Sequence, residues 1–455
     1  MKKKYYIVLI GIIFIILAFL NTGCKNGSQS KIKTLAEYTN IEEFQSVPYM
    51  ETKGNYLRAA DYGNGDYVLH ITESTVEEYK VYLKSVEAAG FKKHSDNGES
   101  AMEGYAYSAS YTKGRLTLTV SHAVQLGYTY ISASNDLPLS EHLIYSEQYE
   151  KDADKKTATK LHMMQMMGSA GCAFIYELKN GHFVVYDGGS TSDAKHLLET
   201  LNNLTPGDEK PVIEAWFLSH CHGDHHGALL AITQDANMVQ QIYVNGFYYV
   251  EPSQKLFDSL TTQSNASGNS IVTRAYKMFK TESGATPEFY RPKLGQRYYF
   301  CDIMIDVAMT LEQIPYNQYK GTDFNDTSTW LMSHIDGQRI LFAGDAGRDA
   351  TNIAVQMFDE AYLKMDMFLP FHHGINVYND FTDLCTYDVV LYPAFRAGSV
   401  WDSRLDLKAE SQNERLKAKA KEVFHHGDGS ITLTFPYKIG TAEIGEDWQH
   451  LYRPL

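Results

Sequence analysis

Apolar residues recur at the spacing of one helix face between Val76 and Val86, and strand-like segments surround this run. The run follows Ser74-Thr75-Val76-Glu77, which has the form of a capping box, and it ends at Gly90. The strand-like segments, with turn residues between them, cover residues 66–71, 106–111, 115–120 and 128–133. This pattern predicts a small α+β domain over residues 36–150, with its boundary in the charged stretch 149–157.

Beyond residue 157, four apolar runs typical of buried strands each end in polar residues. The runs cover residues 183–186, 212–217, 339–343 and 367–371. They lead, in this order, into Asp187-Gly188-Gly189, the segment 218–227, Gly344-Asp345 and His372-His373-Gly374. After the second of these segments, residues 228–232 are typical of the beginning of a helix. The candidate functional side chains therefore follow directly on predicted strands.

The segment His220-Cys221-His222-Gly223-Asp224-His225 places four potential metal ligands on one short loop. Imidazole and carboxylate groups together suit Zn²⁺, Mn²⁺ or iron. His220 and His222, one residue apart, can face one metal, while Asp224 and His225 face a second. A histidine cluster that only caps the helix is the alternative, but such a set of ligands is costly to keep without a metal.

These four segments, in this order, resemble the metallo-β-lactamase fold superfamily of hydrolases over about residues 160–435. The resemblance implies an α/β (α+β) fold in which a four-layer αβ/βα sandwich, residues 157–455, follows the small domain. It also implies two divalent metal ions, zinc or else manganese or iron, and a water molecule that they activate. In such a site Asp187 would brace the metal loop, and Asp224 and Asp345 would hold the nucleophile and help to manage its proton. The implied metal ligands are His220, His222, Asp224, His225, Asp345 and His373.

The pair His372-His373 leaves a choice between two histidines. Neighbouring residues of a strand face opposite sides, so only one of them can point at the metals without a kink. We expect His373 to be the ligand, because the last ligand of the family commonly precedes a glycine. His372 would then support the ligands or contact the substrate.

The chain departs from the family pattern at one ligand. Many members place another histidine between the first loop and the bridging aspartate, but the only histidine between His226 and His372 is His334, in a predicted hairpin turn. At the expected place the chain has Asn325-Asp326-Thr327-Ser328, which resembles the subgroup with the hydrolase domain of bacterial DNA-uptake channels. The first metal site would then be weaker, more exposed or selective for a metal other than zinc. Asn325 would either donate to an oxyanion or brace its own turn.

Three other segments receive structural interpretations. Cys221, between two candidate ligands, is predicted to be a small buried side chain that faces away from the metals. Residues 245–292 are predicted to be an insertion that builds the pocket wall. His425-His426-Gly427 is predicted to form a hairpin turn before the strand-like residues 430–435, without binding a metal.

The amino terminus has the zones of a secretory signal. Three lysines precede the apolar run 5–20, and Asn21-Thr22-Gly23-Cys24 follows it. This arrangement resembles a bacterial lipoprotein signal, residues 1–23, in which Cys24 is lipidated; residues 24–35 would form a tether. An uncleaved anchor helix is the alternative. Both interpretations place the body of the protein outside the cytoplasm, attached to the membrane.

Composition restricts the partners. The formal net charge of −14 becomes −17 when residues 1–23, with three lysines and no acid, are removed. An acidic body disfavours unspecific binding of polyanions, so nucleic acid is a less favoured partner than a small molecule or a cell-envelope component. Four widely spaced cysteines remain after Cys24, and they form no disulfide framework.

The sequence therefore predicts an extracytoplasmic, membrane-tethered hydrolase that uses metal-activated water. The missing histidine and the Asn325-x-x-Ser328 motif favour phosphoester or phosphodiester substrates. Two alternatives stay open: hydrolysis of a β-lactam or lactone, and a non-catalytic, metal-containing binding protein of the cell envelope.

Overall fold

A computed structural model describes residues 32–63, 65–145, 158–167, 171–252, 274–314, 324–394 and 407–445. The predicted signal 1–23, Cys24, most of the predicted tether and the whole of the predicted boundary 149–157 lie outside the described residues. Within the described ranges, every helix is too short or too polar to cross a membrane.

The first part of the chain folds into a six-stranded antiparallel sheet in the order β1-β2-β6-β5-β4-β3. The helix α3, Val76–Ala88, lies along one face of this sheet and buries Tyr79, Tyr82, Leu83 and Val86. The predicted helix and all four predicted strands are confirmed. The strands are β1 Asn55–Asp61, β2 Tyr67–Thr72, β3 Lys92–Asp96, β4 Ala106–Lys113, β5 Leu116–Ala123 and β6 Tyr128–Ser134, and a short helix α2, Leu35–Thr39, precedes them.

The capping box of α3 lies one residue later than predicted. The side chain of Thr75, not Ser74, accepts a hydrogen bond from the backbone N–H of Glu78, and the Glu78 carboxylate accepts one from the Thr75 backbone N–H. Ser74 instead bonds with the hydroxyl of Thr129 on β6, at 2.8 Å. The tertiary contact of Ser74 therefore decides which of two adjacent hydroxyl residues caps the helix.

The second part of the chain contains two larger sheets. A nine-stranded sheet has the order β13-β12-β10-β9-β8-β7-β21-β22, with β11 beside β10. Its strands are β7 Lys160–Met163, β8 Ala173–Glu177, β9 Phe183–Asp187, β10 Val212–Phe217, β11 Tyr243–Val244, β12 Gly246–Tyr248, β13 Glu288–Tyr290, β21 Ile431–Thr434 and β22 Glu443–Ile444. A seven-stranded sheet consists of β14 Arg297–Phe300, β15 Ile303–Met309, β16 Trp330–Ile335, β17 Gln338–Phe342, β18 Met367–Phe368, β19 Val389–Tyr392 and β20 Glu422–His425, in that order.

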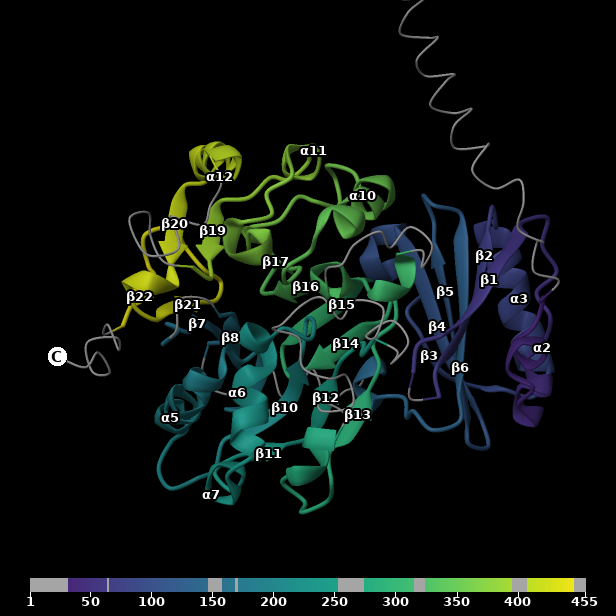
Figure 1. The fold of residues 1–455 in the computed structure, drawn as a ribbon, viewed down its shortest axis with the longest axis horizontal. Helices are drawn as coiled ribbons and strands as arrows, with labels where there is room; N and C mark the ends of the chain where they lie inside the picture. Colours follow the sequence, from purple (N-terminus) through teal and green to yellow (C-terminus); the bar gives the residue numbers. More distant parts are fainter. Residues whose placement is uncertain are drawn as a thin grey trace, which may run out of the picture.

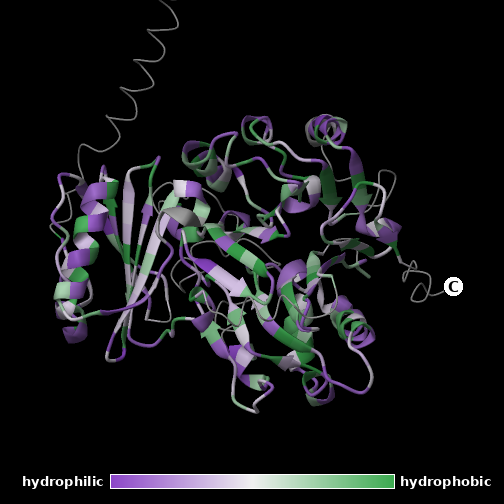
Figure 2. Ribbon diagram, turned by 180° about the vertical axis from the view of Figure 1, so that it is seen from behind, coloured by the Kyte–Doolittle hydropathy of each residue, from purple (hydrophilic) through white to green (hydrophobic). Residues whose placement is uncertain are grey.

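These two sheets face each other across a shared apolar core, and helices cover their outer faces. Phe174, Tyr186 and Phe217 of the first sheet meet Phe342 and Phe300 of the second in that core. Each such buried side chain contributes about 1.5–3 kcal/mol to stability. The helices α5 Ala194–Leu204, α6 Gly223–Thr233 and α7 Ala236–Val239 lie beside the first sheet, and α10 Arg348–Met357, α11 Asn379–Thr382 and α12 Leu407–Lys419 beside the second (Figure 1). The predicted four-layer sandwich is confirmed, and Figure 2 shows hydrophobic residues concentrated on its central strands.

Two sequence interpretations of this part need correction. Residues 245–292 are not one insertion between the metal loop and the next strands, because their two ends supply β12 and β13, which continue the nine-stranded sheet parallel to β10. Strands of three residues are too short to show a period. Residues 253–273 lie outside the described residues, so the pocket wall stays a prediction. The segment 425–427 is not a hairpin turn either, because β20 belongs to the seven-stranded sheet and β21 to the nine-stranded one. The chain crosses between the sheets there.

The six-stranded sheet packs its other face against the sandwich. Ser121 Oγ donates to the carbonyl of Leu294 over 2.7 Å, and Asn97 Nδ2 donates to that of Gly295 over 3.1 Å. Gly295 has φ +79°, and a Cβ at this position would lie 3.0 Å from the backbone of Tyr107, so the close approach of the two parts requires glycine here. The first part of the chain is thus joined to the sandwich beside β13 and β14.

Candidate metal centre

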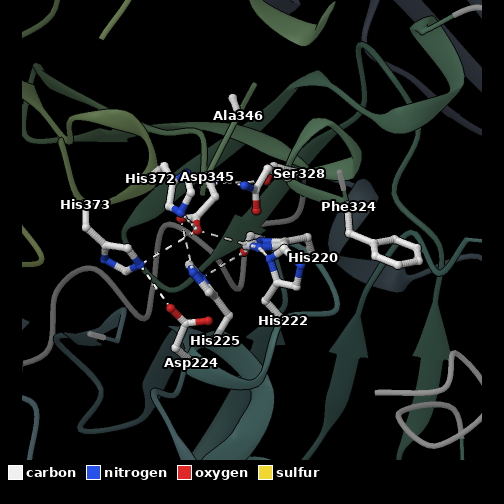
Figure 3. A network of polar contacts seen from close by, with 12 residues as sticks. His220, His222, Asp224, His225, Phe324, Ser328, Asp345, Ala346, His372 and His373 are labelled. Atoms are coloured by element: carbon white, nitrogen blue, oxygen red, sulfur yellow. Dashed lines mark hydrogen bonds and ion pairs between the residues drawn. The ribbon is translucent and has the colours of Figure 1, made fainter. Parts of the chain in front are cut away.

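The candidate site lies where four strands end. β9 ends at Asp187, β10 leads through Ser219 into the loop before α6, β17 leads to Asp345, and β18 leads to the pair His372-His373. The helix α6 begins at Gly223, five residues earlier than predicted, so Asp224 and His225 lie in its first turn. Figure 3 shows the side chains from these segments pointing toward one another around Asp345.

One group of potential ligands consists of His220, His222 and Asp345. Nε2 of His220 lies 2.9 Å from Nδ1 of His222 and 3.8 Å from Oδ2 of Asp345. The ring of Phe324 packs edge-on against His222. All three ligand atoms lie within 4.8 Å of one another, which is the spacing that one ion can bridge.

A second group consists of Asp224, His225, Asp345 and His373. Nε2 of His225 lies 3.1 Å from Oδ1 of Asp345. Nε2 of His373 lies 3.3 Å from Oδ2 of Asp224 and 3.7 Å from Oδ2 of Asp345. Asp345 therefore belongs to both groups, as expected of a bridging carboxylate.

Asp187 holds the metal loop from behind. This buried residue has φ +57°, and its carboxylate accepts hydrogen bonds from Ser219 N and Ser219 Oγ and from His225 Nδ1, each at 2.8 Å. The bond from His225 fixes the ring so that Nε2 faces Asp345. Ser219 was not a candidate from the sequence, although it directly precedes the first histidine.

His372 and His373 lie on a kink and not on a strand. Both have left-handed backbone, with φ +49° and +57°, and Gly374 follows at φ +92°. The rule that only one of two neighbours can face the site therefore does not apply, and both rings point toward Asp345 (Figure 3). Only His373 belongs to a group of mutually close ligand atoms, and its Nδ1 donates to the carbonyl of Pro393 over 2.8 Å.

The Asn325-x-x-Ser328 motif forms a short 3-10 turn, Phe324–Thr327, beside the first group. The Asn325 carbonyl accepts from the backbone N–H of Ser328 within this turn. Nδ2 of its side chain lies 3.3 Å from Nδ1 of His372, a contact that neither sequence interpretation of Asn325 included. Oγ of Ser328 accepts from the backbone N–H of Asp345 over 3.1 Å, so the motif also contacts the backbone that carries the shared carboxylate.

Burial and charge act together on the ionisable groups of the site. Burial alone would raise the pKa of Asp345, but His225, His373 and His372 hold it well below its usual range. Burial would lower the pKa of His225, yet Asp345, Asp187 and Asp224 hold it well above the ordinary value. Burial lowers the pKa of His220 well below the usual range. The site thus consists of charged carboxylates and buried imidazoles packed together.

The buried cysteines nearby have different surroundings. Cys221 packs in an apolar cluster that includes its neighbour Tyr249. Among the described residues, it belongs to none of the groups of potential ligands. Cys172 was not a candidate from the sequence, but its sulfur lies within 4.8 Å of ligand atoms of Asp187 and His225. Burial raises the pKa of the Cys172 thiol to about 12.

His334 and His426 contact residues outside the two groups of potential ligands. His334 lies at the end of β16, where its Nε2 contacts Oδ2 of Asp306 at 2.9 Å. His426 is buried, and its Nδ1 accepts from the backbone N–H of Met166. Neither belongs to a group of ligand atoms within the described part of the chain.

The donor set fits divalent metal ions. Nε2 of His225 is buried and makes no hydrogen bond to any described residue, while its other nitrogen is committed to Asp187. Two imidazole nitrogens at 2.9 Å and carboxylates between buried rings are costly to assemble unless a cation joins them. Imidazole with carboxylate oxygen suits zinc, manganese or iron.

Comparison with known proteins agrees with this geometry. Residues 170–377 match the family model described as the metallo-beta-lactamase superfamily. A search of curated proteins gives no match.

Solved structures similar to this chain include three proteins of low sequence identity. A metallo-β-lactamase with a HARLDQ motif from Cronobacter sakazakii is 11% identical, with 48% of this chain and 79% of that chain covered and a TM-score of 0.28. A protein of the metallo-β-lactamase superfamily from Thermotoga maritima is 11% identical, covering 58% and 98%, with a TM-score of 0.28. The short form of human tRNase Z is 14% identical, covering 51% and 91%, with a TM-score of 0.28. The matched segment 170–377, which contains every ligand position from His220 to His373, and the layered sheets around it support a metallo-β-lactamase superfamily fold for this part of the chain.

Proposed function

We propose that this chain is a metal-dependent hydrolase of phosphoester or phosphodiester bonds. The position of Asp345 is the observation that carries the proposal. Its Oδ1 lies 3.1 Å from Nε2 of His225, whereas its Oδ2 lies 3.8 Å from Nε2 of His220. One carboxylate thus faces two separate sets of imidazoles, as in sites where a carboxylate bridges two ions.

Residues of the chain itself would hold the metal ions and orient the attacking water. His220 and His222 would hold one ion, and Asp224, His225 and His373 the other, with Asp345 shared. Two divalent ions, when bound, supply Lewis acidity and make hydroxide available near neutral pH. Asp345 and Asp224 would orient the attacking water, since both carboxylates only accept hydrogen bonds when ionised.

The first group of ligands favours a phosphate ester over a β-lactam or lactone. It has two imidazoles where many members of the superfamily have three, and the sequence has Asn325 and Ser328 where the third histidine is expected. Side-chain N–H groups beside a reacting centre suit the anionic oxygens of a phosphoryl group.

The location of the enzyme belongs to the same proposal. The apolar run 5–20 before Cys24 supports a lipid-anchored protein outside the cytoplasm of a bacterial cell. The charge of −17 after residue 23 favours a small-molecule or cell-envelope substrate over a nucleic acid.

The test is turnover of bis(p-nitrophenyl) phosphate by residues 32–455, with Zn²⁺ and Mn²⁺ tried separately. Asp345→Asn and Asp224→Asn should each lower turnover by several powers of ten with a much smaller change in thermal stability, because each carboxylate positions the nucleophile. Asp383→Asn is the matched control, since Asp383 is an exposed partner of Arg415 on the surface.

Two results would replace the proposal. Cleavage of a β-lactam or lactone without phosphodiester turnover would assign the site to those substrates. Bound metal without turnover of any ester would indicate a binding protein of the cell envelope.

A further inference from the structure

The histidines of the site differ in what their Nδ1 atoms contact. Nδ1 of His225 lies 2.8 Å from a carboxylate oxygen of Asp187, and Nδ1 of His373 lies 2.8 Å from the carbonyl oxygen of Pro393. Both partners can only accept a hydrogen bond, so each Nδ1 carries a hydrogen, and Nε2 is the nitrogen that can release its own proton and offer a lone pair to a metal.

His220 also carries its hydrogen on Nδ1, because Ser219 links this nitrogen to Asp187. Its Nδ1 lies 2.9 Å from Oγ of Ser219, and that hydroxyl lies 2.8 Å from Oδ2 of Asp187. Because the hydroxyl donates its single hydrogen to the carboxylate, it accepts from His220 Nδ1. Nε2 of His220 therefore also carries a lone pair, which faces the site.

His372 has the opposite arrangement. Its Nδ1 lies 3.3 Å from Nδ2 of Asn325, and an amide nitrogen only donates. Nδ1 of His372 therefore accepts, and Nε2 carries the hydrogen. Nε2 lies 3.7 Å from Oδ2 of Asp345, so this N–H group faces the site.

His372 lies at the accessible side of the centre, and its spacing agrees with a role other than metal binding. Its side chain is 26% exposed, like that of Asp224 at 28%, whereas the side chains of His373 and His220 are 1% and 0% exposed. Within the described part of the chain, His372 belongs to no group of ligand atoms that lie within 4.8 Å of one another. A half-buried N–H at the open side of the centre can meet an incoming ligand.

We infer that His372 is a hydrogen-bond donor to an anionic oxygen of the substrate and not a metal ligand, and that Asn325 is the positioning residue that fixes its tautomer. The inference rests on the proposed function, in which the anionic oxygen is a phosphoryl oxygen. It explains why Asn325 stands where a third imidazole ligand would be expected: its amide determines which nitrogen of a neighbouring imidazole bears hydrogen.

The test measures metal content and the affinity of the metal-loaded full chain, in detergent, for inorganic phosphate. His372→Ala should keep the metal content of the wild-type protein and weaken phosphate binding about 10- to 100-fold, as expected for the loss of one hydrogen bond to a charged group. His372→Gln should recover part of that loss, because its amide is a donor but a poor metal ligand. His373→Gln, by contrast, should release metal.

Asn325→Asp tests the tautomer. A carboxylate accepts from Nδ1, so Nε2 of His372 would present a lone pair. We expect metal content at least equal to that of the wild-type protein and phosphate binding as weak as in His372→Ala. Asn376→Asp adds the same charge near the site, where the Asn376 amide contacts the backbone carbonyls of Asp345 and Ala346, and it should weaken phosphate binding less.

Loss of a metal ion from both His372 variants would overturn the inference, since it would identify His372 as a ligand. Unchanged phosphate affinity in His372→Ala, or no phosphate binding by the metal-loaded wild-type protein, would also overturn it. Phosphate binding that depends on His372 in a protein without phosphodiester turnover would support the inference while the proposed reaction fails.

Discussion

Asp187 accepts a hydrogen bond from Nδ1 of His225 over 2.8 Å, and the same carboxylate accepts two more from Ser219. An asparagine has one acceptor oxygen in place of two, so it cannot serve all three donors. We predict that Asp187→Asn lowers the affinity of the second group for metal about 10- to 100-fold, as is typical when a partner of a ligating histidine is removed. Competition with a chelator measures this affinity.

Asp306→Asn is the control for Asp187→Asn. Asp306 is equally buried, but its partners are Arg297 and His334, outside the site. This variant should lose stability, because it leaves a buried guanidinium without its ion pair, and keep the metal affinity. Equal metal affinity in Asp187→Asn and the wild-type protein would contradict the bracing role of Asp187.

The two groups of ligands should also release metal at different chelator concentrations. The second group offers Asp224, His225 and His373 besides the shared Asp345, whereas the first offers only His220 and His222 besides it. Fewer ligands bind an ion less firmly, so the first ion should leave before the second. Metal analysis of the protein after stepwise chelation measures this, and loss of both ions in one step would contradict the asymmetry.

Most of the site could be predicted because its residues directly follow apolar strands. His220, Asp345 and His373 come after β10, β17 and β18, whose composition is visible without a structure. The fold of the sandwich followed from the resemblance of those segments, in their order, to the metallo-β-lactamase superfamily. The short strands β12 and β13 could not be predicted, since three residues carry no period and their place depends on pairing with β10.

The contacts of His372 could not be predicted from the sequence either. Strand alternation assumes extended backbone, but His372 and His373 have positive φ, which is rare for residues other than glycine. The contact from Asn325 to His372 joins residues 47 positions apart, on two turns that meet only in the folded chain. Local patterns therefore indicated the residues of the candidate site, whereas their contacts with one another depend on the tertiary structure.

The anchoring prediction depends on Cys24, which lies outside the described residues. If residues 1–23 are a lipoprotein signal, Cys24→Ala removes the thiol to which lipid is attached. Metabolic labelling with a radioactive fatty acid should then mark the unchanged protein and not the variant. Cys385→Ala, which changes a buried thiol far along the chain, should be labelled like the unchanged protein. Equal labelling of the Cys24 variant would reject the lipoprotein interpretation.

A buried histidine in the six-stranded sheet should make stability depend on pH. Burial, only partly opposed by Glu77 and Glu78, lowers the pKa of His122 to about 4, and its Nδ1 bonds with the hydroxyl of Thr129 at 2.9 Å. In the unfolded chain the pKa of a histidine is about 6.5. Between these two values the unfolded chain binds a proton that the folded chain does not, so the free energy of unfolding falls as the pH drops from about 6.5 to about 4.

His122→Gln removes this titration while its amide can still bond with Thr129. The free energy of unfolding of the unchanged protein minus that of His122→Gln should therefore decrease as the pH is lowered from 8 to 4. The change in that difference is at most on the order of 3 kcal/mol, because the pKa of His122 is about 6.5 in the unfolded chain and about 4 in the folded protein. Urea unfolding of both proteins across this pH range measures it, and the other titrating groups cancel because the two chains share them. A difference that stays constant from pH 8 to pH 4 would mean that the folded protein binds a proton at His122 as readily as the unfolded chain.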